Sequence, residues 1–483
     1  MEIIYYPAFI FLALLVSVVV VLGLGWGLHF ERLFGRHVVP LIPVFIVVAI
    51  GISTMLSDRN VSFYGVFGEA VAVSSNPMGQ WILRLITAMV VCASVVVSLS
   101  AIMRKDLGKV AGGLLFAAFA AYFASSYIIS GVLGSKPSFV HNNFYALIIF
   151  FAAYVTRNQS VDRFVCWSRD GLNLFICFGV LAAAVLPQIA IQEGYAGMFP
   201  GITFRYWGVS SHANVLGPIA VIFLLLLWWK PYRWWGLNLL TATAALISLL
   251  LSQSKTAWIA GAAALVVLLG YHVIYTIRDV KKGKHVSLAQ FAWISTPFLL
   301  ALSLLVVISI GSERGTDNHL QARFGNQVST FTGRDIIWSI TLREWGENPL
   351  FGYGPRLWSD EFASREGYMG MASNAHNQFV DVLGSSGLLG LLCLSVYLLL
   401  LLRYAWSSVD STKGVSLALV GFFLLRCITE VPLKTASIMT LDFLMHFILF
   451  NVLLRARFTS LLPEISTYAL KRRRRSAQTS FSS

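Results

Sequence analysis

Apolar runs of about twenty residues follow one another along most of this chain, and they constrain its fold more than any other feature. A helix needs about 20 apolar residues to cross a bilayer, because its backbone polar groups must be satisfied internally. The composition agrees, since 57% of the residues are hydrophobic and only 12% are charged. We therefore predict an all-α, polytopic integral membrane protein with about 12–14 transmembrane helices.

The division that fits the apolar runs best has about thirteen spans. They are predicted at 8–29, 38–56, 81–103, 110–130, 141–156, 171–191, 213–229, 236–252, 256–277, 287–310, 376–402, 414–430 and 436–454.

A polar insert of some sixty residues, Gly311 to Ser373, interrupts these spans. It divides the chain into transmembrane helices 1 to 10 (residues 1–310), a large periplasmic loop with short helices (311–375), transmembrane helices 11 to 13 (376–456) and a basic cytoplasmic tail (457–483). Because most other residues must satisfy lipid, chemistry is expected in the insert and in the short loops near it.

Lys and Arg gather in alternate loops, for example at Arg278 to Lys284, and in the tail at Lys471 to Arg475. Short loops rich in these residues stay cytoplasmic. The pattern predicts an N-terminus outside, a C-terminus in the cytoplasm and an insert on the outer side. The segment Met1 to Tyr6 has no cationic residue, so the first span is expected to be a retained helix.

The net charge of +14 is explained by this topology and by contact with anionic lipid headgroups in the bilayer. No nucleic-acid partner is predicted. Five cysteines lie in or beside spans, with no Cys-x-x-Cys pair and no His at metal-ligand spacing. Neither a disulfide framework nor a metal site is indicated, and no cofactor is expected.

Two polar stretches stand at the outer ends of predicted spans. In the first, Arg205 precedes His212 and Asn214 at a helix start, where a lipid headgroup would be met. Polar residues at this position also cap helices, and an interfacial Arg also snorkels. In the second, Ser252 to Lys255 places an ammonium at the outer boundary, where it either meets a phosphate or anchors the helix.

Within the insert, the spacing of Ile337, Ile340 and Leu342 predicts an amphipathic helix that begins near Arg334 and ends at Asn348-Pro349. A cation in the first turn of a helix opposes the helix dipole, so Arg334 is better explained by an anionic partner. The following Gly/Pro-rich turn, Pro349 to Pro355, is expected to return the chain to the membrane with Tyr353 exposed.

His376 opens the next span, with Asn377 and Asp381 within one or two turns. Histidine is the usual general base near neutral pH, although a lone His at a helix start is more often a cap or an interface residue. The small residues from Gly384 to Gly390 are expected at a close helix–helix crossing.

In order along the chain, these segments resemble the O-antigen ligase and polymerase superfamily over about residues 200–400. The resemblance is carried by Arg205-Tyr-Trp-Gly with His212-Ala-Asn-Val-Leu-Gly, Ser252-Gln-Ser-Lys-Thr-Ala-Trp, Gly333-Arg-Asp-Ile-Ile-Trp, Pro349-Leu-Phe-Gly-Tyr-Gly-Pro and Ala375-His-Asn-Gln-Phe-Val-Asp-Val-Leu.

The resemblance implies a GT-C-like helical glycosyltransferase of the bacterial inner membrane, active at the periplasmic face without a metal. It would transfer glycan from an undecaprenyl-diphosphate-linked oligosaccharide to a sugar hydroxyl of a glycan acceptor. His376 would be the catalytic base and Arg334 the loop arginine. Arg205, His212, Asn214, Lys255, Asn377, Asp381 and Tyr353 would bind diphosphate or sugar.

Lys255 stands where similar ligases carry an Arg, and a Lys cannot make the bidentate contact of a guanidinium. Together with Thr332-Gly-Arg-Asp-Ile-Ile-Trp, it resembles the exopolysaccharide-polymerase branch, which favours polymerisation of repeat units over ligation to lipid A core. A chain-length regulator and a flippase would be partners of such a polymerase. Two further readings stay open: a lipid-linked oligosaccharide flippase, with charges along a path through the membrane, and a non-catalytic scaffold.

Overall fold

The computed structural model describes residues 37–62, 76–104, 113–195, 199, 202–281, 334–365 and 373–458. Its described residues are predominantly helical, with one two-stranded sheet, so the all-α prediction is confirmed. The predicted spans 8–29 and 287–310, the insert before Arg334 and the tail after residue 458 lie outside the described residues.

Every predicted span in the described part of the chain coincides with a helix of the structure. The helices are His37–Met55, α2 (Pro77–Met103), α3 (Gly113–Phe123) continued by η2 (Ala124–Ile129) and α4 (Ser130–Leu133), α5 (Asn143–Val155), α6 (Val161–Val185), α8 (Ala213–Trp229), α9 (Trp235–Leu251), α10 (Lys255–Lys281), α15 (Gln378–Ser407), α16 (Val415–Thr429) and 441–458.

Six of the helices described are long and apolar enough to cross a membrane. They are His37–Met55, Pro77–Met103, Gly113–Leu133, Val161–Val185, Lys255–Arg278 and Gln378–Ser407, and shorter apolar helices such as α8 and α16 pack among them. The chain is therefore a multi-pass membrane protein.

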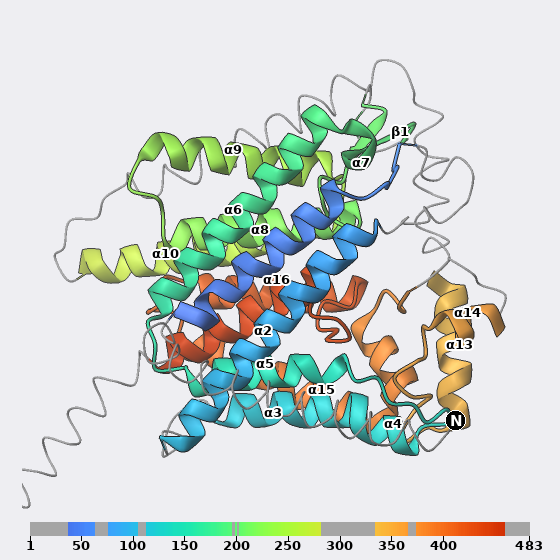
Figure 1. Cartoon of the computed structure of the whole chain (residues 1–483). Helices are drawn as coiled ribbons and strands as arrows, with labels where there is room; N and C mark the ends of the chain where they lie inside the picture. Colours follow the sequence, from blue (N-terminus) through green and yellow to red (C-terminus); the bar gives the residue numbers. More distant parts are fainter. Residues whose placement is uncertain are drawn as a thin grey trace, which may run out of the picture.

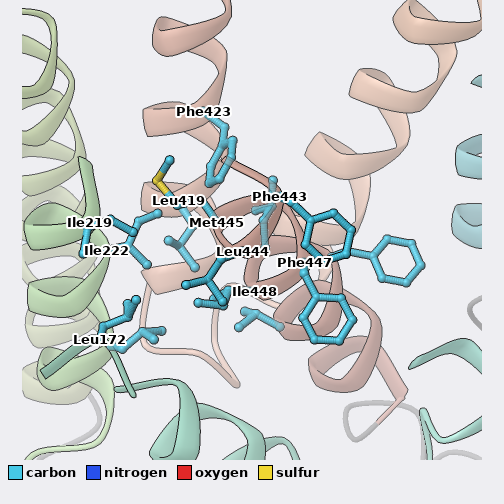
Figure 2. Packing of buried hydrophobic residues seen from close by; sticks show 14 of the residues in the cluster. Leu172, Ile219, Ile222, Leu419, Phe423, Phe443, Leu444, Met445, Phe447 and Ile448 are labelled. Atoms are coloured by element: carbon cyan, nitrogen blue, oxygen red, sulfur yellow. The ribbon is translucent and has the colours of Figure 1, made fainter. Parts of the chain in front are cut away.

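The core lies where α16 and the helix 441–458 pass through the middle of the bundle. Figure 2 shows Leu419 of α16 next to Ile219 and Ile222 of α8, and Phe443, Leu444 and Ile448 of the helix 441–458 belong to the same cluster. All of these side chains are almost completely buried. α10 also packs against α16, and α15 packs against both α16 and α3. This packing fixes the ends of α8, α15 and α16 relative to one another.

The insert contributes α13 (Arg334–Glu347) and the short α14 (Asp360–Arg365), which lie beside one end of the bundle (Figure 1). As predicted from the sequence, α13 ends directly before Asn348. It packs against α15. The same end of the bundle carries α7 (Pro187–Ala190) and an antiparallel hairpin of β1 (Ile191–Glu193) and β2 (Phe204–Tyr206), in which Gln192 is paired with Arg205.

α15 is broken at Gly387, where φ is 64° and ψ is −163°. The segment Pro349 to Gly354 fills the break. Its carbonyls at Pro349 and Leu350 accept from the amides of Leu388 and Leu389, and its amides at Tyr353 and Gly354 donate to the carbonyls of Gly384 and Ser385. Four backbone groups of α15 beside the break therefore find partners in this segment, as burial demands.

The Gly/Pro turn thus enters the bundle, and the expectation of an exposed Tyr353 is wrong. Tyr353 is 7% exposed and makes an edge-to-face contact with Phe362 at a centroid separation of 5.3 Å. The ring belongs to a small cluster with Ile340, Leu357 and Phe362. Burial against apolar neighbours suits a structural role better than sugar stacking.

Candidate functional site

Glu430 is the point at which the sequence-predicted residues meet. It follows the last residue of α16, and its side chain is 11% exposed. Its Oε2 lies 3.0 Å from His376 Nδ1, and its Oε1 lies 3.8 Å from Arg334 Nη2 and accepts from Asn214 Nδ2 at 3.4 Å. We call the group Arg205, His212, Asn214, Arg334, His376 and Glu430 the Glu430 cluster. It joins residues that lie more than two hundred positions apart.

His376 is held in place by its backbone. Its φ of 48° lies in the left-handed region, which a non-glycine residue adopts only when its surroundings impose it. Asn374 Oδ1 accepts from the His376 amide at 2.8 Å, Asp381 accepts from the Ala375 amide at 2.9 Å, and Trp338 Nε1 donates to the Ala375 carbonyl at 2.8 Å. The imidazole is therefore presented at a fixed angle between α13 and α15, with its side chain 31% exposed.

Asn377 and Asp381 support this segment. Asn377 caps α15 by accepting from the amides of Phe379 and Val380, and its Nδ2 donates to the Ile428 carbonyl at 3.0 Å. That bond ties the start of α15 to the end of α16, two residues before Glu430. Asp381 is 7% exposed, and its contact with Ala375 points to a positioning role for this carboxylate.

Arg334 is the first residue of α13, with a side chain 21% exposed. The anionic partner expected from its unfavourable place in the helix dipole is Glu430, and their separation of 3.8 Å is longer than a hydrogen bond. The guanidinium is thus attracted to the carboxylate without a tight contact.

Arg205 reaches the cluster from β2. Its Nη2 donates to Asn214 Oδ1 at 2.6 Å, and its Nε donates to the Ser252 carbonyl at 2.8 Å. Lys255 begins α10 three residues after Ser252 and is exposed. The arginine therefore connects two stretches that the sequence analysis singled out separately.

His212 caps α8, since its Nδ1 accepts from the Asn214 amide at 3.1 Å. Burial lowers the pKa of His212 to about 4, with the charge of Arg205 acting in the same direction. His212 is accordingly neutral at working pH, as its acceptor role requires. In the absence of a bound anion it is therefore a neutral helix cap.

The loop in front of α8 is held in place by Arg59, which no sequence pattern marks as a site residue. Its guanidinium is buried and donates to the carbonyls of Ile189, Gly208 and Ser210. Burial lowers the pKa of Arg59 to about 10, so it remains a cation. An Arg surrounded by carbonyls is a typical way to fix an irregular loop.

Arg426 lies beneath the cluster and also escaped the sequence analysis as a site residue. Its spacing of four residues from Glu430 is that of a pair within one helix, but α16 ends at Thr429 and Glu430 turns away with an extended backbone. Arg426 instead lies 3.9 Å from Asp442 and donates to the Asn214 carbonyl at 3.1 Å. The close contacts of Glu430 are with His376, Arg334 and Asn214, and the charge of Arg426 acts on it without a direct contact.

Burial by itself raises the pKa of Glu430, but the hydrogen bond and charge of His376 and the charges of Arg426 and Arg334 outweigh it, so the net shift is downward. Glu430 is a carboxylate at neutral pH. Around it stand two arginines, Arg205 and Arg334, so the cluster is suited to an added anion. Among the described residues, no three His, Cys, Asp or Glu side chains gather as metal ligands.

Comparison with known proteins supports the resemblance that the sequence motifs indicate. Residues 240–395 match the family model described as O-antigen ligase. The chain is also 25% identical over 260 residues to the exopolysaccharide production protein ExoQ of Rhizobium meliloti (strain 1021), covering 48% of this chain and 55% of that protein. This chain thus spans about half the length of that relative. The predicted resemblance to the O-antigen ligase and polymerase superfamily is confirmed. Lys255, Arg334 and His376 lie inside the matched region, whereas Arg205 and Glu430 lie outside it.

Proposed function

We propose, from the similarity to O-antigen ligases and to an exopolysaccharide production protein, that this chain is a membrane glycosyltransferase. It polymerises undecaprenyl-diphosphate-linked oligosaccharide repeat units at the periplasmic face of the bacterial inner membrane. The observation that carries the proposal is the convergence of His376 and Arg334 on one carboxylate, with Arg205 joined through Asn214. A base and two phosphate-binding cations are what this transfer needs.

His376 is the group that accepts the proton of the acceptor hydroxyl. Its Nδ1 is occupied by Glu430, which leaves Nε2 for the acceptor. As Nε2 takes the proton, the acceptor oxygen bonds to the anomeric carbon of the donor, and the bond from that carbon to the phosphate oxygen breaks. The electron pair leaves with undecaprenyl diphosphate, and the proton on His376 passes to solvent after product release.

Arg334 and Arg205 stabilise the departing diphosphate. A diphosphate gains negative charge as its bond to the sugar breaks, and fixed cations at that place lower the barrier, each by about 3–4 kcal/mol in comparable oxyanion sites. Lys255, exposed at the start of α10, adds a charge near Arg205 without the bidentate geometry of a guanidinium.

Ligation of glycan to a lipid A core is the second candidate, because the matched family model carries the description O-antigen ligase. The lysine at 255 favours polymerisation. A flippase would place charges along a path through the membrane, whereas the Glu430 cluster gathers at helix ends. A chain-length regulator and a flippase remain proposed partners of the polymerase.

The test uses purified protein in lipid with undecaprenyl-diphosphate-linked repeat units, with and without lipid A core, and gel analysis of the product. Repeat units alone should give a ladder, and His376→Ala should lower its rate by about 10²–10⁴-fold. His141→Ala, which removes an exposed loop histidine, is the matched control and should keep the ladder.

Product that forms only with the core acceptor would replace polymerase by ligase. Labelled lipid that crosses the bilayer without any glycan product would replace enzyme by transporter. An unchanged ladder in His376→Ala would remove His376 as the base.

A further inference from the structure

Glu430 serves two partners with unequal geometry. The contact with His376 is a hydrogen bond of 3.0 Å, whereas the contact with Arg334 is a loose ion pair of 3.8 Å. Charge-assisted hydrogen bonds normally close to about 2.7–2.9 Å. Arg334 is therefore attracted to Glu430 without the hydrogen bonds that a guanidinium can make to an anion.

Arg334 is also the partner that can leave. It sits in the first turn of α13, and its side chain is twice as exposed as that of Glu430, 21% against 11%. A diphosphate offers several oxygens in the geometry that a guanidinium binds with two parallel bonds. A donor lipid arriving at the cluster would thus draw Arg334 from a weak contact to a strong one.

The departure of Arg334 would change the charge that His376 experiences. Glu430 faces His376 directly, and Arg334, Arg426 and Arg205 supply the cationic side of the cluster. His212 is a neutral cap nearby, and Lys434 lies at the Ser373 carbonyl. Arg426 is buried and held by Asp442 and Asn214, and Arg205 is held by Asn214 and Ser252. Among the contacts of the described residues, Arg334 is therefore the least firmly held of the three cations.

We propose that Glu430 is a positioning residue that Arg334 and His376 share, so that donor binding transfers Arg334 to the diphosphate and strengthens His376 as a base. The inference rests on the proposed function and adds a coupling to it. Before the donor arrives, Arg334 neutralises part of the Glu430 charge. After it arrives, Asn214 still donates to Oε1 and Arg426 still acts on the carboxylate, but the charge of Arg334 no longer opposes its support of an imidazolium. Proton abstraction is thereby timed to donor binding.

The coupling predicts opposite effects of Glu430→Gln on binding and on turnover. Without the carboxylate, Arg334 has no internal anion to leave, so undecaprenyl diphosphate should bind about 5-fold more tightly. His376 loses its charged partner, so kcat should fall by about 10- to 100-fold. Glu430→Asp keeps the charge and should retain more of the turnover than Glu430→Gln. A residue that only supports the fold would weaken both properties together.

The experiment measures the Kd of undecaprenyl diphosphate and, separately, kcat for the ladder reaction, with the full chain in nanodiscs. Glu361→Gln is the matched control, because it removes the same charge from the exposed face of α14 and should leave both values unchanged. Thermal unfolding checks that each variant is folded. If Glu430→Gln is not folded, Glu430→Ala, which also removes the carboxylate, repeats the comparison.

Equal or weaker diphosphate binding in Glu430→Gln overturns the coupling, as does an absence of diphosphate binding to the wild type. If the coupling is overturned in this way but the wild type still produces the ladder, the proposed polymerase activity is unaffected. Loss of the ladder in the wild type would instead remove the proposed function itself. The binding measurement therefore tests the coupling, and the product measurement tests the proposed function separately.

Discussion

At the scale of single residues, the Glu430 cluster is held by contacts that leave cationic charge to spare. Glu430 is one carboxylate between Arg205, Arg334 and His376, while Arg426 forms its ion pair with Asp442. An excess of positive charge at a partly accessible place attracts an anion more effectively than a neutralised network does. The same arrangement keeps His212 neutral, because Arg205 and burial both oppose its protonation.

His212 should accordingly make stability depend on pH. Its pKa is about 4 in the folded protein and about 6.5 in an unfolded chain, so only the unfolded state binds a proton between these values. The stabilisation is complete above pH 6.5 and is lost as the pH falls towards 4. His212→Asn keeps a capping side chain without titrating. The drop in Tm from pH 7.5 to 5 should therefore be smaller in His212→Asn, by roughly 2 °C. Equal drops in the two proteins would show that His212 is protonated as easily in the folded state.

The residues of the cluster were predictable to different degrees. Arg334 and His376 carry charge or basicity at helix starts that local structure does not explain, and that signal is visible in the sequence. Glu430 was hidden because a spacing of four from Arg426 indicates a pair within a helix. The end of α16 at Thr429 is a tertiary fact, since it is the loop after it that turns the carboxylate towards His376. Tyr353 was misjudged because a Gly/Pro turn reads as a surface feature.

At the scale of elements, the apolar runs sufficed to locate every helix in the described spans, because a membrane helix depends on length and hydropathy more than on its neighbours. The break in α15 did not follow from the same reasoning. Gly384 to Gly390 predicted a close crossing, and α13 does pack there, with Thr341 against Gly384. The helix also opens at Gly387 and binds the segment Pro349 to Gly354. This could not be predicted locally, because the segment lies more than thirty residues earlier in the chain.

Gly387 should be the most sensitive glycine of this joint. A Cβ there would collide with the Leu350 carbonyl, and φ is 64°, a conformation that costs other residues about 1–2 kcal/mol before any clash. Gly387→Ala should lower the free energy of unfolding by at least about 2 kcal/mol, measured by thermal or denaturant unfolding in detergent. Gly421→Ala is the matched control, because Gly421 lies in α16 with nothing within 4 Å of the added Cβ, and it should stabilise slightly. Similar effects of the two substitutions would contradict the described break.

At the scale of the whole molecule, the bundle brings α8, α13, α15 and α16 together at one end, where the Glu430 cluster lies (Figure 1). The loop between α15 and α16, with Asp410 and Lys413, lies at the other end of the thirty-residue α15. The charge bias of the loops predicts that this far end lies in the cytoplasm and the cluster outside. Lipid-linked donors presented at the outer leaflet could then reach the cluster without crossing the bilayer.

Cysteine accessibility tests this orientation directly. In a background with the five native cysteines replaced, Asp360→Cys on exposed α14 should react with a membrane-impermeant maleimide added to cells whose outer membrane has been permeabilised. Ser411→Cys, exposed in the loop between α15 and α16, should react only after the inner membrane is also opened. Reaction in the reverse order would place the Glu430 cluster in the cytoplasm. A periplasmic polymerase would then be excluded, because its donor and acceptor would meet on the wrong side of the membrane.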